Sequence, residues 1–508
     1  MNKQMKWKLA LTMMLAVMMV WLAACEPVGS TDLNQVLTDN LNRQSYEGDG
    51  TVTVKLITND EARQLSDDKL YQLLGNEMTV RIDDMKMNNK TEFYIQGDFI
   101  YAQGEIGFEM YNEMDGLAIK LEGYDEPLIM NNAMLAEEAA LAMMDFQQLQ
   151  EQILDIQDEL ITVVGEYVID RFPNPDTISI DEVETTVNGE EIQATQVHME
   201  IPADAMFSLL QQFAINIAED EEGLRELIGA LYDIIIPVVK EHAGEELEAD
   251  PMAAALIDNR EFVVEMVFTS LQQGLASFTT EVESGLEEVA SATHSDTMLT
   301  LDYYLDEDNQ IRKSEMNLLL KPVGVEDEPI TAMEITSTEQ YWNINGDVAV
   351  PTMSIEDGIE IYDMGNEYEF MKHVDQSSDL YELLHATGAT EKEVLLFIED
   401  SPYMMNAYME DGTSYVPVRY VSEQLYGDVK WNHERKEIMI IDHPTGNEVV
   451  ITIGSDVATV NNESFTWSKQ PLLIDNTLFV PVRDFADMLE VEWTFNKGLQ
   501  YVELTRHF

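Results

Sequence analysis

A repeated segment near the C-terminus constrains the fold of this chain most. The sequence YVPVR at residues 415–419 recurs as FVPVR at residues 479–483, 64 positions further along. In each copy a polar turn and a short β-rich run precede Pro417 or Pro481, and proline suits the first turn of a helix. We expect a strand, a helix (418–425 or 482–489) and a further strand in each copy. Agreement over this length indicates two pseudo-repeated halves of one small α+β domain.

The second half of each copy extends the repeat. Aligning Val429 and Trp431 with Val491 and Trp493 places one tryptophan on a strand in each half. Returning strands are expected at 438–441 and 502–504, and additional strands at 449–453 and 458–460 lie between the copies. The domain is predicted to span residues 392–508.

The pattern G/D-x-T-x-V-P-V-R, helix, L-G-x-V-x-W resembles the copper amine oxidase N-terminal-like domain, also called the stalk domain. This family is common in surface proteins of Gram-positive bacteria, and its stalk lies apart from the catalytic domain. The copies depart from the pattern after the helix, where Tyr426 is inserted before Gly427 and where Val491 follows Glu490 without a glycine. The resemblance therefore implies a stalk-like fold and no activity of its own.

Amine oxidation needs a tyrosine-derived quinone from an Asn-Tyr-Asp/Glu motif and a copper site of three histidines. The chain has no Asn-Tyr pair, and its eight histidines include no His-x-His. The motifs of zinc proteases, serine hydrolases, P-loop proteins and dinucleotide-binding proteins are also absent from the sequence. We expect a protein that is not an enzyme, with no catalytic residues, no cofactor and no resident metal.

Two pairs of residues in the repeat admit a functional and a structural interpretation. Arg419 and Arg483 could bind an anion, although bonding to local carbonyls or carboxylates is favoured. Trp431 and Trp493 could stack on sugar rings, although repeated strand tryptophans usually belong to a core. We expect structural roles for both pairs.

The N-terminus has the successive regions of a secretion signal. Lys3, Lys6 and Lys8 precede sixteen uncharged residues at 9–24, and the only cysteine, Cys25, ends the segment LAAC at 22–25. This segment resembles the lipobox of bacterial lipoproteins, in which the cysteine receives a diacylglyceryl group and becomes the mature N-terminus. Two acyl chains anchor a protein stably. A transmembrane helix needs about 20 apolar residues, so this run is short for a spanning segment. The resemblance implies a signal peptide at 1–24 and lipidation of Cys25 at the outer face of the cell membrane. A signal peptide without lipidation is the other alternative.

The charge balance restricts the partners. Against 97 acidic residues stand 28 Lys and Arg, for a net charge of −69. Such a surface repels nucleic acids and anionic lipid headgroups, so neither is expected as a partner. An acidic surface favours cations and basic surfaces as partners. Alternatively, the charge serves only to keep the protein soluble in a salty or alkaline medium. With Cys25 lipidated, no thiol remains for a disulfide or a metal site.

Residues 25–345 are predicted to form an α+β domain in which a large antiparallel sheet carries packed helices. A helix at 30–44 precedes alternating runs at 50–57 and 78–130, with tight turns expected at Gly97-Asp98 and Asp115-Gly116. Helical patterns follow at 132–166, from Pro202 onward and at 252–276, with a hairpin at 178–201 turned at Asn188-Gly189 and strands at 298–305, 311–320 and 331–342. This order resembles lipoprotein-carrier and glycolipid-carrier folds. Residues 346–391 are expected to be a linker with one short helix near 379–385.

Three functions follow, in decreasing order. The first is a non-enzymatic, membrane-anchored extracellular lipoprotein that binds or scaffolds components of the cell envelope. The second is a carrier or sensor of an apolar, lipid-like ligand in the N-terminal domain. The third is an envelope glycan hydrolase, which would need converging carboxylates. The acidic segment at 306–310 suggests a calcium loop, but Ile311 stands where such a loop needs glycine, so a hairpin turn is expected there.

Overall fold

The computed structural model describes residues 32–59, 69–89, 92–113, 116–131, 146–242, 258–325, 328–361, 367–399 and 405–508. The predicted signal peptide and Cys25 lie outside these ranges. The chain divides into two compact units. The first unit ends at Ile361, and the second runs from Tyr362 to Phe508 and includes Gly123–Asp125.

The first unit is built on a sheet that has twelve strands among the described residues, in the order β12-β6-β5-β4-β3-β2-β1-β11-β10-β9-β8-β7. All neighbours are antiparallel except β12 and β6. The strands are β1 (Ser45–Thr58), β2 (Glu77–Asn88), β3 (Glu92–Tyr101), β4 (Gly104–Glu113), β5 (Gly116–Leu121), β6 (Leu128–Asn131), β7 (Ile178–Val187), β8 (Glu190–Pro202), β9 (Met298–Leu305), β10 (Ile311–Leu320), β11 (Ile330–Trp342) and β12 (Ile359–Glu360). The helices are α2 (Leu33–Leu41), α3 (Lys69–Leu74), α5 (Phe146–Arg171), α6 (Ala203–Glu219), α7 (Glu221–His242) and α10 (Arg260–Ala292). The predicted α+β class is confirmed.

Local sequence signals fix several of these elements. Asp32 caps α2 by accepting a hydrogen bond from the Gln35 N–H at 3.2 Å, and Asn259 caps α10 in the same way. Asn188 and Gly189 both have positive φ, which gives the expected tight turn between β7 and β8. The segment 306–310 is the expected loop between β9 and β10, where Asp306 Oδ1 accepts hydrogen bonds from two backbone N–H groups.

The turn predicted at Gly97-Asp98 is wrong, because both residues lie inside β3. A bulge in β2 next to Ile82 brings the Arg81 carbonyl oxygen close to Gly97, and a Cβ there would overlap that oxygen. Glycine in a strand marks such a close backbone approach as well as a turn. The turn predicted at Asp115-Gly116 falls partly outside the described residues.

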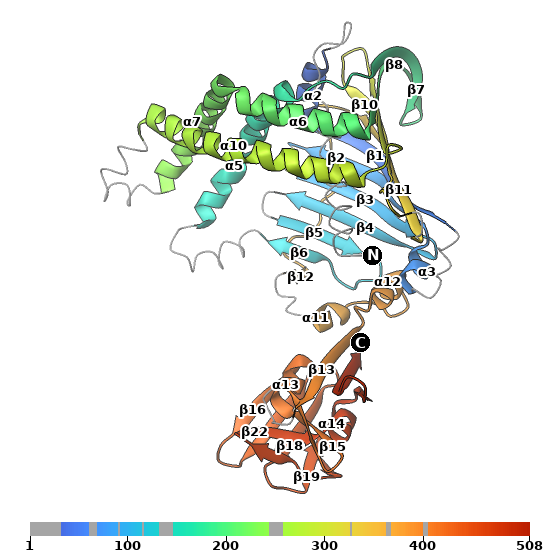
Figure 1. Cartoon of the computed structure of the whole chain (residues 1–508), viewed down its shortest axis with the longest axis vertical. Coiled ribbons are helices and arrows are strands. Elements are labelled where there is room, and N and C mark those ends of the chain that lie inside the picture. Colours follow the sequence, from blue (N-terminus) through green and yellow to red (C-terminus); the bar gives the residue numbers. More distant parts are fainter. Residues whose placement is uncertain are drawn as a thin grey trace. The chain divides into compact units, whose positions relative to one another are not determined.

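The core of the first unit lies between the helices and part of the sheet. Helices α2, α5 and α6 pack their apolar residues against β1 and β8 to β11, with Val197, Leu299 and Leu305 fully buried. In Figure 1 the helices lie over this half of the sheet, and strands β3 to β6 extend beyond them. Buried residues alternate with more exposed ones at 197–201 of β8 and 299–301 of β9, as expected when one sheet face is covered.

The linker expected at 346–391 is only partly irregular. Its first half packs on the first unit: β12 pairs with β6, and Ile355 joins a buried cluster with Tyr94, Tyr111 and Ile129. The apolar residues of this half are spaced without periodicity, so no local pattern indicated their burial. The helix expected near 379–385 is present as α12 (Asp379–Thr387), capped by Ser378.

The second unit contains two sheets with the strand orders β21-β22-β15-β14-β13-β24-β23 and β16-β17-β18-β19-β20. Its elements are α11 (Glu367–Met371), α12, β13 (Glu391–Glu399), β14 (Ala407–Glu410), β15 (Thr413–Pro417), α13 (Val418–Gln424), β16 (Gly427–Asn432), β17 (Glu437–Asp442), β18 (Asn447–Thr452), β19 (Val457–Val460), β20 (Glu463–Thr466), β21 (Leu472–Ile474), β22 (Thr477–Pro481), α14 (Val482–Leu489), β23 (Glu492–Asn496) and β24 (Tyr501–His507). The predicted strand, helix and strand of each copy are confirmed. No helix in the described ranges is long and apolar enough to cross a membrane.

The two copies are related by a constant offset of 64 residues. Tyr426 and Glu490, which follow the two helices, both have positive φ, and Asn432 and Asn496 cap equivalent turns. The strand register then equates Trp431 with Phe495 and Val429 with Trp493. The alignment of Trp431 with Trp493 is therefore wrong by two residues, because similar residue types two positions apart on the strand suggested a gap that the backbone does not contain.

Candidate functional site

One face of strands β2 to β6 is formed almost entirely by apolar side chains. Cross-strand partners point to the same side of a sheet, and the pairing joins Val54 to Met78, Val80 to Phe99 and Met110 to Ile119. Val54 belongs to the core that the helices cover, so this is the helix side of the sheet. The members, called the β2–β6 apolar face, are Met78, Val80, Ile82, Met85, Met87, Phe93, Ile95, Phe99, Ile106, Phe108, Met110, Leu117, Ile119, Leu121, Leu128 and Met130.

The β2–β6 apolar face is only partly buried. Ile106 and Leu128 are buried, whereas the other members are half-buried. None of them belongs to the core that α2, α5 and α6 build over β1 and β8 to β11. The described positions of this face carry no charged side chain, and five of its members are methionines, which adapt to irregular apolar partners. Such a surface suits flexible apolar groups.

The opposite face of the same strands carries charged and polar side chains beside the buried cluster that Ile355 joins. Lys120 Nζ lies 2.7 Å from Glu109 Oε1, and the Tyr94 hydroxyl donates to Glu109 Oε2 at 3.1 Å. Burial and this hydrogen bond raise the pKa of Tyr94 to about 12. The hydrogen bond from Lys120 keeps the pKa of Glu109 below its ordinary value. The outer face therefore carries charged side chains that the β2–β6 apolar face lacks, and these side chains provide matched control positions.

The helices of the first unit also present exposed apolar side chains. Ile161 and Val164 of α5 are 43% and 40% exposed, and Phe262 and Met266 of α10 are 45% and 51% exposed. Phe262 and Met266 lie four residues apart and so share one side of their helix. Helices α5 and α10 thus carry exposed apolar side chains of their own.

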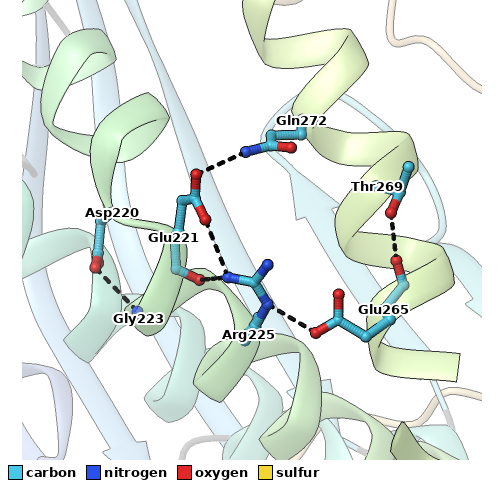
Figure 2. Close-up of polar contacts among 7 residues, drawn as sticks. All are labelled: Asp220, Glu221, Gly223, Arg225, Glu265, Thr269 and Gln272. Carbon is cyan, nitrogen blue, oxygen red and sulfur yellow. Dashed lines mark hydrogen bonds and ion pairs between the residues drawn. The ribbon is translucent and has the colours of Figure 1, made fainter. Parts of the chain in front are cut away.

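Arginines tie the helices of this layer together. Figure 2 shows Arg225 of α7 between Glu221 on its own helix and Glu265 on α10, with the Arg225 Nε to Glu265 Oε1 distance at 2.8 Å. The Arg225 guanidinium also lies 3.6 Å from the centre of the Phe268 ring. Arg260 of α10 makes two 2.8 Å bonds to Asp233 of α7. Helices α7 and α10 are therefore linked at two places.

A third arginine links α5 to the joint between α6 and α7. Arg171 Nε donates to Asp220 Oδ2 at 2.6 Å. Asp220 Oδ1 accepts the Gly223 N–H at 2.9 Å, a bond drawn in Figure 2. Burial raises the pKa of Asp220, but the bonds from Gly223 and Arg171 outweigh it and leave the pKa below its ordinary value. A Cβ on Gly223 would overlap Asp220 Oδ2, so glycine makes room for this contact.

The residues singled out in the repeat lie in the second unit and form no common site. Pro417 and Pro481 are buried at the starts of α13 and α14. Arg419 donates to Glu423 and to the Val429 carbonyl, which fits the structural role expected for it. Arg483 lies over the Trp493 ring, 5.8 Å from its centre.

The two tryptophans differ from each other. Trp493 is half-buried and packs against the core of the second unit, whereas Trp431 is 44% exposed. The core role expected for Trp431 is therefore wrong. Trp431 lies on β16, whose only hydrogen-bonded neighbour in the described sheet is β17, so less of the domain covers it.

A buried ion pair in the second unit had no counterpart among the sequence predictions. Arg506 makes bonds of 2.9 and 2.8 Å to the two Asp442 oxygens, and both side chains are almost fully buried. Position 506 is the 64-residue equivalent of position 442, so the pair lies where the two halves meet. Val416 and Val480, also equivalent, pair directly between β15 and β22. The repeat spacing was the available signal, since residues on a pseudo-twofold axis contact their own equivalents.

Polar groupings elsewhere give little support for catalysis. His198 Nδ1 lies 2.8 Å from Asp302 Oδ1, and Ser179 stands opposite His198 on β7. Asp302 also accepts from Gln196, and these residues lie on the outer surface of the sheet. Within the described ranges, no group of three or more His, Cys, Asp or Glu residues is placed to hold a metal ion.

Part of the second unit is similar to a known domain family. Residues 397–504 match the copper amine oxidase N-terminal domain family, as the resemblance of the repeat implied. This match lies within the second unit and is to the non-catalytic domain of those oxidases. No curated protein matches the chain.

Proposed function

We propose that this chain is a non-enzymatic lipoprotein, anchored through Cys25 at the outer face of the cell membrane, whose first unit binds the acyl chains of a lipid. The observation that carries the proposal is the β2–β6 apolar face, with its half-buried members and its lack of charge. This proposal combines the first two functions considered from the sequence: the envelope lipoprotein binds a component, and that component is an apolar, lipid-like ligand.

The energetics favour an apolar occupant over water. Burying apolar surface contributes a favourable free energy of roughly 25 cal/mol per Å². Each half-buried member of this face still exposes apolar area that a ligand could cover. A charged or strongly hydrated ligand would lose its hydration on this face without gaining a polar partner. Acyl chains meet the requirement, and the methionines can follow chains of different shape.

The rest of the chain supports an envelope setting. The signal-like N-terminus and the lone Cys25 support secretion and lipidation, and the second unit matches a domain that is non-catalytic in the oxidases. The hydrolase alternative gains no specific support from the described residues. The second unit would then act as a connecting or contact domain.

The test is lipid binding by the mature chain. Purified protein is extracted for lipid mass spectrometry and titrated with a fluorescent long-chain fatty acid. We expect bound lipid, and roughly tenfold weaker probe binding after Met110→Gln with Ile119→Asn, since each change removes apolar area. The control is Glu109→Gln with Lys120→Gln on the outer face of the same strands, which should leave binding unchanged.

Two results would overturn the proposal. One is a mature protein that carries no lipid and does not bind the probe. The other is equal weakening by the inner-face and outer-face variants, with circular dichroism showing that both remain folded.

A further inference from the structure

The second unit carries an exposed apolar patch that its fold does not need. Leu395 and Phe397 of β13 are 48% and 56% exposed, and Leu499, in the turn before β24, is 67% exposed. The Gln500 carbonyl accepts a 2.8 Å hydrogen bond from the Ile398 N–H, which brings that turn beside the end of β13. Tyr501 of β24 pairs with Phe397 and their ring centres lie 5.9 Å apart. We call Leu395, Phe397, Leu499 and Tyr501 the β13–β24 patch.

The repeat supplies an internal control for this patch. The pairing of β13 with β24 is equivalent to that of β18 with β17, so Leu395 and Phe397 correspond to Val450 and Thr452. The first half of the repeat thus forms the same strand pair with the smaller Val450 in place of Leu395 and the polar Thr452 in place of Phe397. The inward neighbour Leu396 corresponds to Ile451, and both are fully buried. Packing therefore explains the inward residue but not the two outward ones.

Carboxylates lie beside the strand part of the patch, and Lys497 is in the turn that carries Leu499. Glu503 stands opposite Leu395 on β24, Glu393 is the next outward residue of β13, and Glu492 lies on the edge strand β23. The outward positions of β13, β24 and β23 carry His507 as their one basic residue in the described structure, and its Nδ1 lies 3.5 Å from Glu391 Oε1. An apolar centre with an acidic border is complementary to an apolar segment flanked by basic side chains.

We propose that the β13–β24 patch binds a basic, apolar peptide segment of a partner protein. Charge selects this occupant over two others. A second copy of this chain would place the same carboxylates against one another, and an anionic lipid surface would be repelled by them. Aromatic and aliphatic residues at the centre of an interface, bordered by charge, form the usual arrangement of a protein-binding hot spot.

The test uses the full mature chain and three synthetic peptides of ten residues, alternating Lys-Leu, Lys-Ser and Glu-Leu. We expect the Lys-Leu peptide to bind at least tenfold more tightly than either of the others by calorimetry, with an affinity that falls as salt rises. The Lys-Ser peptide measures attraction to the acidic surface as a whole. The variant Leu395→Val with Phe397→Thr, which copies the first half of the repeat, should reduce Lys-Leu binding to the Lys-Ser level.

Val450→Ala with Thr452→Ala is the matched control on the first half and should leave peptide binding unchanged. Equal binding of the Lys-Leu peptide to wild type and to the Leu395→Val, Phe397→Thr variant would overturn the proposal. So would tight binding of the Glu-Leu peptide, or self-association of the chain that this variant abolishes. The lipid-binding assay of the first unit is independent, so failure of one proposal is distinguishable from failure of the other.

Discussion

Asp442 and Arg506 form a buried ion pair between the two halves of the second unit. Removing one member of a buried ion pair leaves the other charge unpaired, which costs roughly 3–5 kcal/mol. We therefore expect Asp442→Leu to lower the free energy of unfolding of the second unit by about that amount. Adding Arg506→Met should recover most of the loss, because no charge is then left buried. Denaturant unfolding followed by tryptophan fluorescence measures both.

The exposed pair Arg419 and Glu423 is the control for that prediction. These side chains are 54% and 49% exposed, and such pairs contribute about 0–1 kcal/mol. Arg419→Met should therefore cost less than about 1 kcal/mol. A loss after Arg419→Met as large as that after Asp442→Leu would contradict the assignment of the stabilising contact to the buried pair.

At the residue scale the sequence predicted local features, such as turns and helix starts, better than it predicted contacts between residues far apart in the chain. The Asn188-Gly189 turn and the Pro417 and Pro481 helix starts follow from rules that act over a few residues. The prediction for Trp431 failed because its exposure depends on the strand order of the sheet. The Asp442–Arg506 pair depends on how two halves meet, which no local pattern encodes.

At the scale of elements, the helix layer depends on close approach between α7 and its neighbours. Gly223→Ala would bring a Cβ into overlap with Asp220 Oδ2 and with the Arg171 guanidinium. We expect this change to lower the free energy of unfolding of the first unit by about 1–3 kcal/mol, as overpacking usually does. A Cβ added at Gly274 of α10 would meet open space, so Gly274→Ala should stabilise by about 0.5–1 kcal/mol. Thermal unfolding that shows the same change for both would contradict this account.

The contribution of Asp220, between α6 and α7, to the free energy of unfolding should depend on pH. The folded pKa of Asp220 is below its ordinary value, so its ionised form contributes stability that is present above the unfolded pKa of about 3.9. That contribution is lost as pH falls through the folded pKa. The difference in unfolding free energy between wild type and Asp220→Asn should therefore be largest near neutral pH and shrink below about pH 4. A difference that is constant from neutral pH to well below that value would show that the carboxylate charge has no role.

Elements were predictable where periodicity was strong. The hairpin β7–β8, the strands β9 to β11 and the helices α12, α13 and α14 appear at their expected positions. The predicted linker failed because residues 346–361 pack on a sheet whose surface is assembled from distant strands. The turn expected at Gly97 failed because glycine serves both turns and bulges, and only the pairing with β2 distinguishes them.

At the scale of the whole molecule, the proposed location of the protein depends on one side chain. We expect Cys25→Ala to release the protein from the membrane fraction into the medium, since the acyl chains would supply the anchor. Immunoblotting of washed membranes and culture medium measures the distribution. A variant that stays in the membrane fraction, with its signal segment uncleaved, would support a spanning segment in place of a lipid anchor.

The candidate site could be predicted only in outline from the sequence. Alternating runs indicated a sheet with one apolar side, and the order of elements resembled carrier folds. Which runs share a face, and that the helix core ends at β1, follow from the register of strands separated by more than a hundred residues. The 64-residue repeat predicted the fold of the second unit but did not reveal the β13–β24 patch, whose β13 side precedes the repeat.

The central claim is that acyl chains bind on the β2–β6 apolar face. The most direct measurement is photo-crosslinking of the mature chain with a long-chain fatty acid that carries a diazirine, followed by mapping of the labelled peptides. We predict that labels fall on residues 78–130 at inward positions such as Phe108, Met110 and Ile119, and that unlabelled fatty acid competes them away. Labels that fall mainly on the outer face of these strands or on the second unit, without competition, would contradict the account.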